Sequence, residues 1–285
     1  MPEATTVEGG GSRTLFVSDL DFTLLRRDAT LSPRTIDTIN RLVAEGMLFT
    51  YATARSFSSS RAVTRELRLT LPVITYGGTV TADPDSGEPL RVDFMEAAVV
   101  STILSAAREV GVEPVVFAME AGRDRIRWHP GRPSAGVQSF VTRREGDPRL
   151  LPLDGWDELD PASVFYATLI AERERLAELR VALAEVLAGA AHFLSVDGYT
   201  REHWLEIHAA GGTKALAARR LADELRTGRM IAFGDNVNDV PLFGVADESC
   251  AVANAVPELR ALATRTIPSN DEDGVARWLE ECVRG

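Results

Sequence analysis

The sequence predicts an α/β protein in which a doubly wound parallel sheet is interrupted by an inserted α/β domain. Apolar runs of strand length alternate with amphipathic stretches of helical spacing at both ends of the chain. This alternation stops near the turn-rich segment Asp83–Gly87 and resumes after Gly211–Gly212. Because strand-helix repeats favour right-handed crossovers between parallel strands, strand ends far apart in the sequence meet at one edge of the sheet.

The first repeats of the predicted sheet lie between residues 15 and 76. An apolar run from Leu15 leads into Asp19 as a buried strand, and Ser32 and Pro33 then have the residue types of a helix N-cap and first helical position. The remaining elements predicted here are a strand at Met47–Tyr51, a helix through Leu69 and a strand at Val73–Tyr76.

The inserted segment has a different pattern, with turn-bounded extended runs that indicate substantial antiparallel sheet. We expect a hairpin around Asp83–Gly87, helices at Glu96–Val110 and Glu172–Leu187, and strands at Val115–Ala118, Arg125–Trp128, Val164–Ile170, around Phe193 and around Leu205. A helix at Lys214–Leu225 and a strand at Met230–Phe233 return the chain to the sheet. The predicted domains are a disordered tail at 1–12, a core at 13–82 and 209–285, and an inserted domain at 83–208.

Composition narrows the class of partner. The 285 residues can bury two hydrophobic cores, and the net charge of −11 disfavours nucleic acid and anionic membranes. The sequence has no apolar stretch long enough to cross a bilayer, no signal-like start and only two cysteines, Cys250 and Cys282. We expect a cytoplasmic protein that is a monomer or a small homo-oligomer.

Two carboxylates follow the first predicted strand. These are Asp19 and Asp21, and Thr23 adds a hydroxyl two residues later. The ligand sites of open α/β sheets lie beyond such strand ends. Carboxylates this close repel each other when both are ionised. This repulsion must be relieved by a cation, by hydrogen-bond donors or by protonation of one of them. The pair suits either a nucleophile with a metal or a nucleophile beside an acid, although an ordinary polar turn has the same residue types.

A second acidic group follows the predicted strand Met230–Phe233. Asp235 and Asp239 stand four residues apart in Gly234–Asp239, beside two amides. A turn that caps the next helix needs one carboxylate, whereas this segment has two. If Asp19 and Asp235 converge, they form a hard oxygen site suited to Mg²⁺, which favours carboxylates together with a substrate phosphate.

The best candidate for an anion-binding cation is Lys214, the only lysine in the chain. It stands after two glycines at a predicted helix start, where free backbone amides also favour an anion. Thr53 offers a hydroxyl at another strand end, and Arg55 suits either phosphate contact or helix capping.

These residues resemble the haloacid dehalogenase-like (HAD) superfamily, and within it the Cof-type subfamily IIB phosphatases. The matching motifs, in order, are Asp19-Leu20-Asp21-Phe22-Thr23, Ala52-Thr53-Ala54-Arg55, Lys214 and Gly234-Asp235-Asn236-Val237-Asn238-Asp239, with Asn254 and Asn270–Val275 beyond them. The resemblance implies a Rossmann-like core and a C2B-type cap at residues 83–208.

The resemblance also implies roles for the acidic residues. Asp19 would attack phosphorus to form an aspartyl-phosphate, and Asp21 would protonate the leaving alcohol and then activate water. Mg²⁺ would be bound by the Asp19 carboxylate, the Asp21 backbone carbonyl and Asp235, with Asp239 supporting the site. Thr53 and Lys214 would hold the phosphoryl group, and Asn238 would add a polar contact to phosphate or substrate.

The sequence departs from the commonest motifs of the family at three places. Phe22 and Ala54 replace glycines, and Thr75-Tyr76-Gly77-Gly78 stands where an asparagine-glycine pair is common. No catalytic group is lost, but the shape of the pocket wall is affected. Other cap candidates, which are more often solvated or packing residues, are Arg123, Arg125, Arg127, His129, His203 and Trp204.

The sequence therefore predicts a Mg²⁺-dependent phosphomonoester hydrolase acting on a small phosphorylated metabolite, most plausibly a sugar phosphate. Asp21 separates this prediction from dehalogenases and P-type ATPases, which lack an acid at that position. Two alternatives stay open: a phosphomutase of the phosphomannomutase type, and a binding module without turnover.

Overall fold

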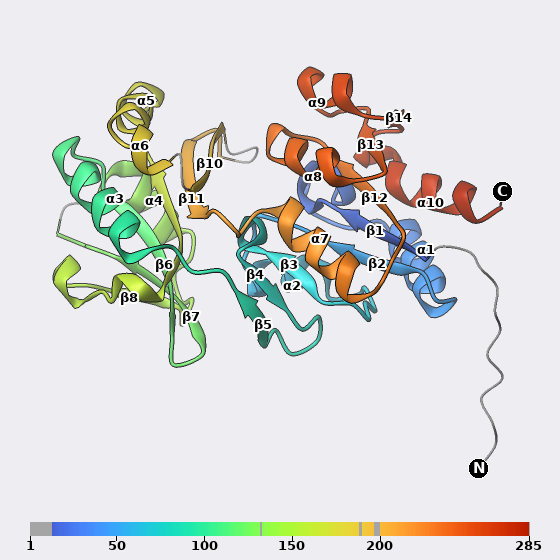
Figure 1. Cartoon of the computed structure of the whole chain (residues 1–285), viewed down its shortest axis with the longest axis horizontal. Helices are drawn as coiled ribbons and strands as arrows, with labels where there is room; N and C mark the ends of the chain where they lie inside the picture. The colour runs from blue at the N-terminus through green and yellow to red at the C-terminus, as the bar shows by residue number, and fades with distance from the viewer. Residues whose placement is uncertain (1–12, 132, 188–189, 197–199, 285) are drawn as a thin grey trace, which may run out of the picture. The chain divides into compact units, whose positions relative to one another are not determined.

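A computed structural model describes residues 13–131, 133–187, 190–196 and 200–284 (Figure 1). The tail predicted at 1–12 lies outside these residues. The chain divides into two compact units, and each is described by itself. The first unit contains Met1–Ala52, Ala62–Leu71 and Ala218–Gly285, and the second contains Thr53–Arg61 and Pro72–Ala217. Helices α2 (Phe57–Thr64) and α7 (Lys214–Glu224) contain residues of both units.

The first unit is built on a parallel sheet of five strands in the order β14-β13-β12-β1-β2. The strands are β1 (Thr14–Ser18), β2 (Leu48–Tyr51), β12 (Arg229–Gly234), β13 (Glu248–Val252) and β14 (Arg265–Ile267). The helices are α1 (Pro33–Ala44), α8 (Val240–Val245), α9 (Pro257–Leu262) and α10 (Gly274–Arg284), with the short helical segments η1 (Leu20–Leu24), η5 (Val237–Asp239) and η6 (Asn270–Glu272). This arrangement confirms the predicted parallel α/β core. The prediction was wrong for the strand at Val73–Tyr76, because β3 (Val73–Thr75) pairs with its antiparallel neighbour in a sheet of the second unit.

Burial explains why the first strand reads as a continuous apolar run. β1 lies between β2 and β12, and Leu15 and Val17 are fully buried. On the same strand Phe16 packs edge-on against Trp278 of α10, which also contacts Phe233 of β12. A central parallel strand covered on both faces needs apolar residues at every position rather than alternating ones.

The predicted start of α1 is confirmed. Ser32 Oγ accepts a hydrogen bond from Thr35 N at 3.0 Å, and Pro33 occupies the first helical position. The hydroxyl satisfies one of the free amides of the first turn, and proline needs no amide partner there.

The second unit contains two sheets. A three-stranded antiparallel sheet has the order β3-β4-β5, and a six-stranded sheet has the order β10-β11-β9-β6-β7-β8, in which only β7 and β8 are parallel. The strands are β3 (Val73–Thr75), β4 (Val80–Ala82), β5 (Pro89–Val92), β6 (Pro114–Glu120), β7 (Arg123–Trp128), β8 (Leu150–Pro152), β9 (Val164–Ile170), β10 (Ala190–Val196) and β11 (His203–Ala209). The helices are α3 (Ala97–Glu109), α4 (Ala135–Thr142), α5 (Arg173–Ala182) and α6 (Ala184–Leu187), with η2 (Tyr76–Gly78), η3 (Trp156–Glu158) and η4 (Pro161–Ser163).

The antiparallel character predicted for the insertion is confirmed, including the hairpin at Asp83–Gly87, which joins β4 to β5. Two helices are shorter than predicted: α2 ends at Thr64 rather than Leu69, and the helix predicted at Glu172–Leu187 is interrupted at Leu183. Helix α4, strand β8 and the elements after β12 were not predicted. Several are only three to six residues long, which is too short for a hydrophobic period to show. None of the described helices is long and apolar enough to span a membrane.

Candidate active site

Asp19 directly follows β1 at the carboxyl edge of the parallel sheet. Its backbone N–H donates to the Phe233 carbonyl at 2.9 Å, and the Ser18 hydroxyl donates to the Asp19 carbonyl at 2.7 Å. The residue is only 5% exposed. The strand ladder therefore continues through Asp19 and fixes its backbone, so the carboxylate has a defined position at the strand end.

Three carboxylates meet at this edge. One oxygen from each of Asp19, Asp235 and Asp239 lies within 4.8 Å of the other two, which confirms the convergence of Asp19 and Asp235 expected from the sequence. Like charges at this spacing repel, and a hard cation between them relieves the repulsion. The donor set consists of carboxylate oxygens, which is the ligand chemistry that Mg²⁺ favours. The residues present thus fit a divalent cation.

Asp239 holds the backbone at this edge of the sheet. It is fully buried, and its Oδ2 accepts hydrogen bonds from the backbone amides of Asp235 at 3.1 Å and Asn236 at 3.3 Å. A Cβ on Gly234 would lie 2.6 Å from the same oxygen, so the close approach requires glycine. Thr23 also contributes, because its hydroxyl donates to Asp235 Oδ1 at 3.4 Å. Amide and hydroxyl donors thus hold two of the three carboxylates.

Asp21 and Phe22 lie in the short helical segment η1. Both have non-helical backbone angles, and Phe22 adopts a left-handed conformation with φ of +59°. A side chain with a Cβ is disfavoured there by about 1–2 kcal/mol. The left-handed backbone gives a physical reason for the usual glycine of the family at this position. Phe22 keeps the glycine-like turn and adds a ring beside Asp21.

Two asparagines fasten this turn from the other end of the chain. Asn254 Nδ2 donates to the Phe22 carbonyl at 2.8 Å, and Asn254 Oδ1 accepts from the Asn270 amide at 3.0 Å. Asn270 Nδ2 in turn donates to the Leu25 carbonyl at 2.9 Å. The sequence motifs contained both asparagines, but their role as supports of the Asp21 segment appears only in the structure.

Thr53 lies in the second unit, immediately after Ala52. Its amide donates to the Ile74 carbonyl at 2.9 Å, and its hydroxyl accepts from the Arg55 amide at 3.1 Å. The Thr53 carbonyl accepts from Gly77 N at 2.9 Å. Arg55 Nη1 donates to the Ser59 carbonyl inside α2 at 3.4 Å, and its role in phosphate contact or helix capping stays a prediction.

Lys214 begins α7 and is also in the second unit. Only 4% of it is exposed. A Cβ on Gly78, whose φ is +116°, would lie 2.1 Å from the Thr213 carbonyl carbon and 2.5 Å from Lys214 N. The backbones of Gly78 and Lys214 are therefore in direct contact, which only glycine permits. We call the residues Gly77, Gly78 and Gly212 the glycine corner.

The glycine corner brings Thr53 and Lys214 to one place. The Gly77 amide donates a hydrogen bond to the Thr53 carbonyl, and the backbone of the next residue, Gly78, packs against the backbone of Lys214. The structure thus groups Asp19, Asp235 and Asp239 in the first unit and Thr53 and Lys214 in the second. Asn238, in the first unit, has a buried Oδ1 with no hydrogen-bond partner among the described residues.

The weaker candidates of the inserted segment make contacts within their own unit. Arg127 pairs with Glu120 at 2.9 Å, Arg125 Nη1 donates to the Pro148 carbonyl at 3.3 Å, and His129 Nε2 lies 2.8 Å from the Asp154 carbonyl. The Trp204 ring packs against Phe140 with centroids 5.8 Å apart. These contacts support packing and surface roles.

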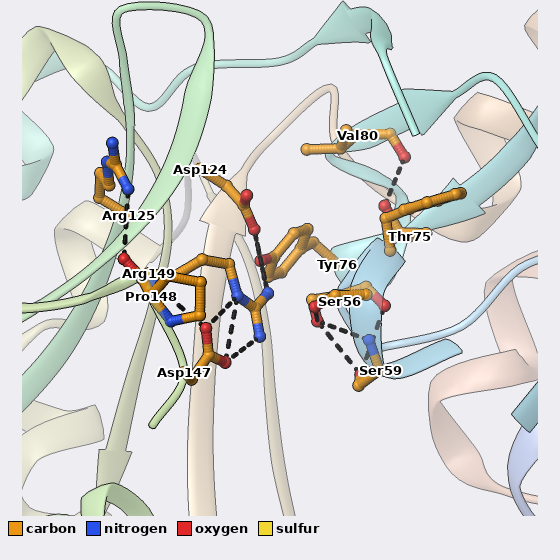
Figure 2. Close-up of polar contacts among 12 residues, drawn as sticks. Ser56, Ser59, Thr75, Tyr76, Val80, Asp124, Arg125, Asp147, Pro148 and Arg149 are labelled. Atoms are coloured by element: carbon orange, nitrogen blue, oxygen red, sulfur yellow. Dashed lines mark hydrogen bonds and ion pairs between the residues drawn. The ribbon is translucent and has the colours of Figure 1, made fainter. Parts of the chain in front are cut away.

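Sequence reasoning missed a polar cluster in the second unit (Figure 2). Arg149 lies between two carboxylates, at 2.6 Å from Asp147 and 3.1 Å from Asp124, and the Tyr76 hydroxyl donates to Asp124. Burial and the neighbouring Asp124 raise the pKa of Tyr76 well above its usual value, so the phenol stays protonated. Tyr76, Asp124 and Arg149 also line a cavity of about 370 Å³. No local sequence signal joins residues so far apart.

Comparison with known proteins finds a family of hydrolases and relatives that are named phosphatases. A profile of the haloacid dehalogenase-like hydrolases matches residues 16–279. The 5-amino-6-(5-phospho-D-ribitylamino)uracil phosphatase of Bacillus subtilis is 26% identical over 274 residues, which cover 94% of this chain and 96% of that protein. The HMP-PP phosphatase of Yersinia pseudotuberculosis is 25% identical over 275 residues, or 92% of each chain.

A solved structure supports the fold. The crystal structure of a haloacid dehalogenase-like hydrolase from Bacteroides thetaiotaomicron has a TM-score of 0.78 at 21% identity and covers 95% of this chain and 99% of its own. The predicted resemblance and the predicted enzyme class, a phosphatase, are confirmed by the profile and the named relatives. Because the profile match extends over most of its length, the chain belongs to the haloacid dehalogenase-like hydrolase family.

Proposed function

We propose that the protein is a Mg²⁺-dependent phosphomonoester hydrolase that acts on a small phosphorylated metabolite through an aspartyl-phosphate on Asp19. The single observation that carries the proposal is the convergence of Asp19, Asp235 and Asp239 within 4.8 Å at the carboxyl edge of a parallel sheet. This is the edge at which open α/β sheets bind ligands.

Three residues would bind the metal, and a fourth would support them. In this proposal the Asp19 carboxylate, the Asp21 backbone carbonyl and Asp235 are ligands, and Asp239 supports Asp235 through the amide hydrogen bond described above. Bound Mg²⁺ would neutralise charge on the phosphoryl oxygens and on the three carboxylates. Asp235 and Asp239 are held by hydroxyl and backbone donors, so these two carboxylates need little reorganisation for binding.

The chain's own residues would then carry the two chemical steps. An Asp19 oxygen attacks phosphorus and the bond from phosphorus to the leaving oxygen breaks, while Asp21 donates its proton to that oxygen. Asp21, now ionised, takes a proton from a water whose oxygen attacks phosphorus, and this releases phosphate and restores Asp19. Thr53 and Lys214 hold the phosphoryl group, Asn238 contacts phosphate or substrate, and Arg55 is a further candidate at the Thr53 segment.

The finer features of the proposal concern substrate and domain roles. We propose a sugar phosphate or related polyol phosphate as the substrate class, which is in keeping with the phosphoribityl group in the name of the Bacillus subtilis relative. Residues 83–208 would act as the cap and 13–82 with 209–285 as the core. The net charge of −11 argues against nucleic acid as a partner, and we propose a monomer or small homo-oligomer.

A phosphate-release screen tests the proposal directly. Wild type, Asp19→Asn and Asp37→Asn would be assayed on sugar phosphates, nucleotides, pyridoxal phosphate and phosphoglycolate, each with Mg²⁺ and with chelator. Asp37 is an exposed carboxylate on α1 in the same unit, so it is a matched control for loss of one charge. We expect release only with Mg²⁺, only from wild type and Asp37→Asn, and a mass increase from phosphorylation of Asp19 with a slow substrate.

Several outcomes would contradict this proposal. Wild-type rates in a clean Asp19→Asn preparation would exclude the nucleophile, and full activity in chelator would exclude the metal. Formation of an isomer in place of phosphate, with dependence on a bisphosphate activator, would identify a phosphomutase. Tight binding without release across the panel would identify a binding module.

A further inference from the structure

His208 occupies the last part of β11, shortly before the chain reaches Lys214. It is only 2% exposed, and its imidazole stacks on the Tyr166 ring of β9 with centroids 5.3 Å apart and an interplanar angle of 16°. The Phe193 ring lies at 5.5 Å. Buried polar rings usually have a hydrogen-bond partner, and His208 has one in the turn that leads to Lys214.

The hydrogen bond of His208 determines its protonation state. Nδ1 lies 2.9 Å from the Gly212 carbonyl oxygen, which can only accept, so Nδ1 carries the hydrogen. The pKa of His208 is lowered to about 4, mainly by burial and to a smaller extent by the nearby His192 and Lys214, while the bond to Gly212 opposes this shift. The ring is therefore neutral at physiological pH, with Nε2 unprotonated.

The bonded carbonyl belongs to the residue two positions before Lys214. Gly212 N also donates to the Ala209 carbonyl at 2.8 Å, so the turn from Ala209 to Gly212 is closed by two hydrogen bonds. A Cβ on Gly212 would lie 2.4 Å from the Thr79 methyl group. The imidazole thus fixes the last turn before α7 while the backbone packs against the segment after Gly78.

The same imidazole contacts the other half of the glycine corner. A Cβ on Gly77 would lie 3.0 Å from Cε1 and 3.2 Å from Nε2 of His208. Gly77 is the residue whose amide donates to the Thr53 carbonyl. One ring therefore touches both the segment that leads to Lys214 and the segment bonded to Thr53.

We propose that His208 is a positioning residue that sets the spacing between Lys214 and Thr53 by bonding the Gly212 carbonyl and packing against Gly77. This inference rests on the proposed function, in which Lys214 and Thr53 hold the phosphoryl group. The role needs a neutral donor with a flat face: the N–H reaches Gly212, and the flat ring fits between Tyr166 and Gly77. A cationic side chain at this depth would repel Lys214.

Two amide variants separate the hydrogen bond from the bulk of the ring. In His208→Asn the amide nitrogen takes the place of Nδ1 and keeps a donor for Gly212, whereas in His208→Gln it takes the place of Nε2 and loses that donor. Both are neutral and polar. We would measure KM and kcat on the best substrate of the screen, the inhibition constant of inorganic phosphate, and phosphate binding by calorimetry.

We expect His208→Asn to stay within about twofold of wild type. For His208→Gln we expect KM and the dissociation constant of inorganic phosphate to rise by about tenfold, since displacements of the order of 1 Å at a binding group have effects of this size or more. Thermal melts identify folded variants. His208→Leu, which keeps apolar volume but offers no donor, gives the same test if the Gln variant does not fold.

A double variant identifies the route of the effect. If His208 acts through Lys214, the Gln substitution weakens phosphate binding far less in a Lys214→Gln background than in wild type. Equal phosphate binding by folded Asn, Gln and Leu variants, an equal loss in the Asn and Gln variants, or full additivity with Lys214→Gln would overturn the proposal. Failure of the phosphatase proposal itself would appear as absence of phosphate release by wild type. Failure of the His208 proposal would appear in calorimetry, as phosphate binding that the variants do not weaken in the expected order.

Discussion

The carboxylates of the first unit and the lysine of the second are held in place by different means. The carboxylates belong to Asp19, Asp235 and Asp239, and the lysine is Lys214 beside the glycine corner. Asp235 and Asp239 are held by hydrogen bonds, from the Thr23 hydroxyl and from backbone amides. The segment that contains Lys214 is held by close backbone packing. A Cβ on Gly78 would lie only 2.1 Å from the Thr213 carbonyl carbon, so this packing requires glycine. Donors or a cation relieve the repulsion between clustered like charges, whereas the position of Lys214 depends on the close approach of two backbone segments.

The two regions also share an unusual feature, an aromatic residue with a left-handed backbone. Phe22 in the first unit has a φ of +59° and Tyr76 in the second has a φ of +50°. The Tyr76 ring is buried against Phe117, Phe165 and Tyr166. Phe22 is only half-buried. The backbone cost is therefore offset by packing to a greater extent in the second unit.

The largest effect that sharpens the comparison is expected at Asp21. We expect Asp21→Asn to slow turnover by about 10²–10⁴-fold because an amide can neither donate nor accept the transferred proton in these steps. Steady-state kinetics with alkyl and aryl phosphates would measure it. The loss in the first step should be smaller for an aryl phosphate, whose leaving group needs little protonation. Nearly wild-type turnover on an alkyl phosphate would exclude the acid-base role of Asp21.

A smaller effect, on stability, is expected at the two left-handed aromatic residues. Asparagine tolerates this backbone, so Tyr76→Asn relieves about 1 kcal/mol of strain but removes a buried ring, at a net cost of about 2–4 kcal/mol. Phe22→Asn loses less packing and should change the unfolding free energy by less than about 1 kcal/mol. Urea unfolding of both variants measures the difference. Equal destabilisation would show that packing does not distinguish the two sites.

The last effect, which appears only at acidic pH, is the pH dependence of stability that His208 gives to the second unit. Its pKa is about 4 in the folded protein against 6.5 unfolded, so between these values the unfolded chain binds more protons. Folding free energy is therefore lost as pH falls through this window, by up to about 3 kcal/mol at pH 4. Burial is the main cause of this shift, and the positive charges of His192 and Lys214 add to it.

Urea unfolding of wild type and His208→Asn across pH 4–7 measures this contribution. Carboxylates titrate in the same range in both proteins, so the difference between the two curves reports His208. We expect the wild-type stability to fall more steeply below pH 6.5. Parallel curves would show that the buried imidazole does not resist protonation.

The sequence predicted the parts of the fold whose residues carry a local signal. Ser32 with Pro33 predicted the start of α1, the uninterrupted apolar run predicted β1, and the turn residues of Asp83–Gly87 predicted the β4–β5 hairpin. Elements such as β8 and β14 have three residues each and were not predicted, since so short a segment shows no period.

The sequence by itself determined the enzyme class, because the chemistry requires carboxylates beyond strand ends and a cation at a helix start. The motifs supply Asp19, Asp21 and Asp235 for the first and Lys214 for the second. Only the tertiary structure decided which side chains from distant segments contact one another. The Asn254–Asn270 pair, the Tyr76–Asp124–Arg149 cluster and the His208 contacts with Gly77 and Gly212 all join residues from separate segments. Such contacts depend on close packing between distant parts of the chain, and no local pattern of residues encodes them.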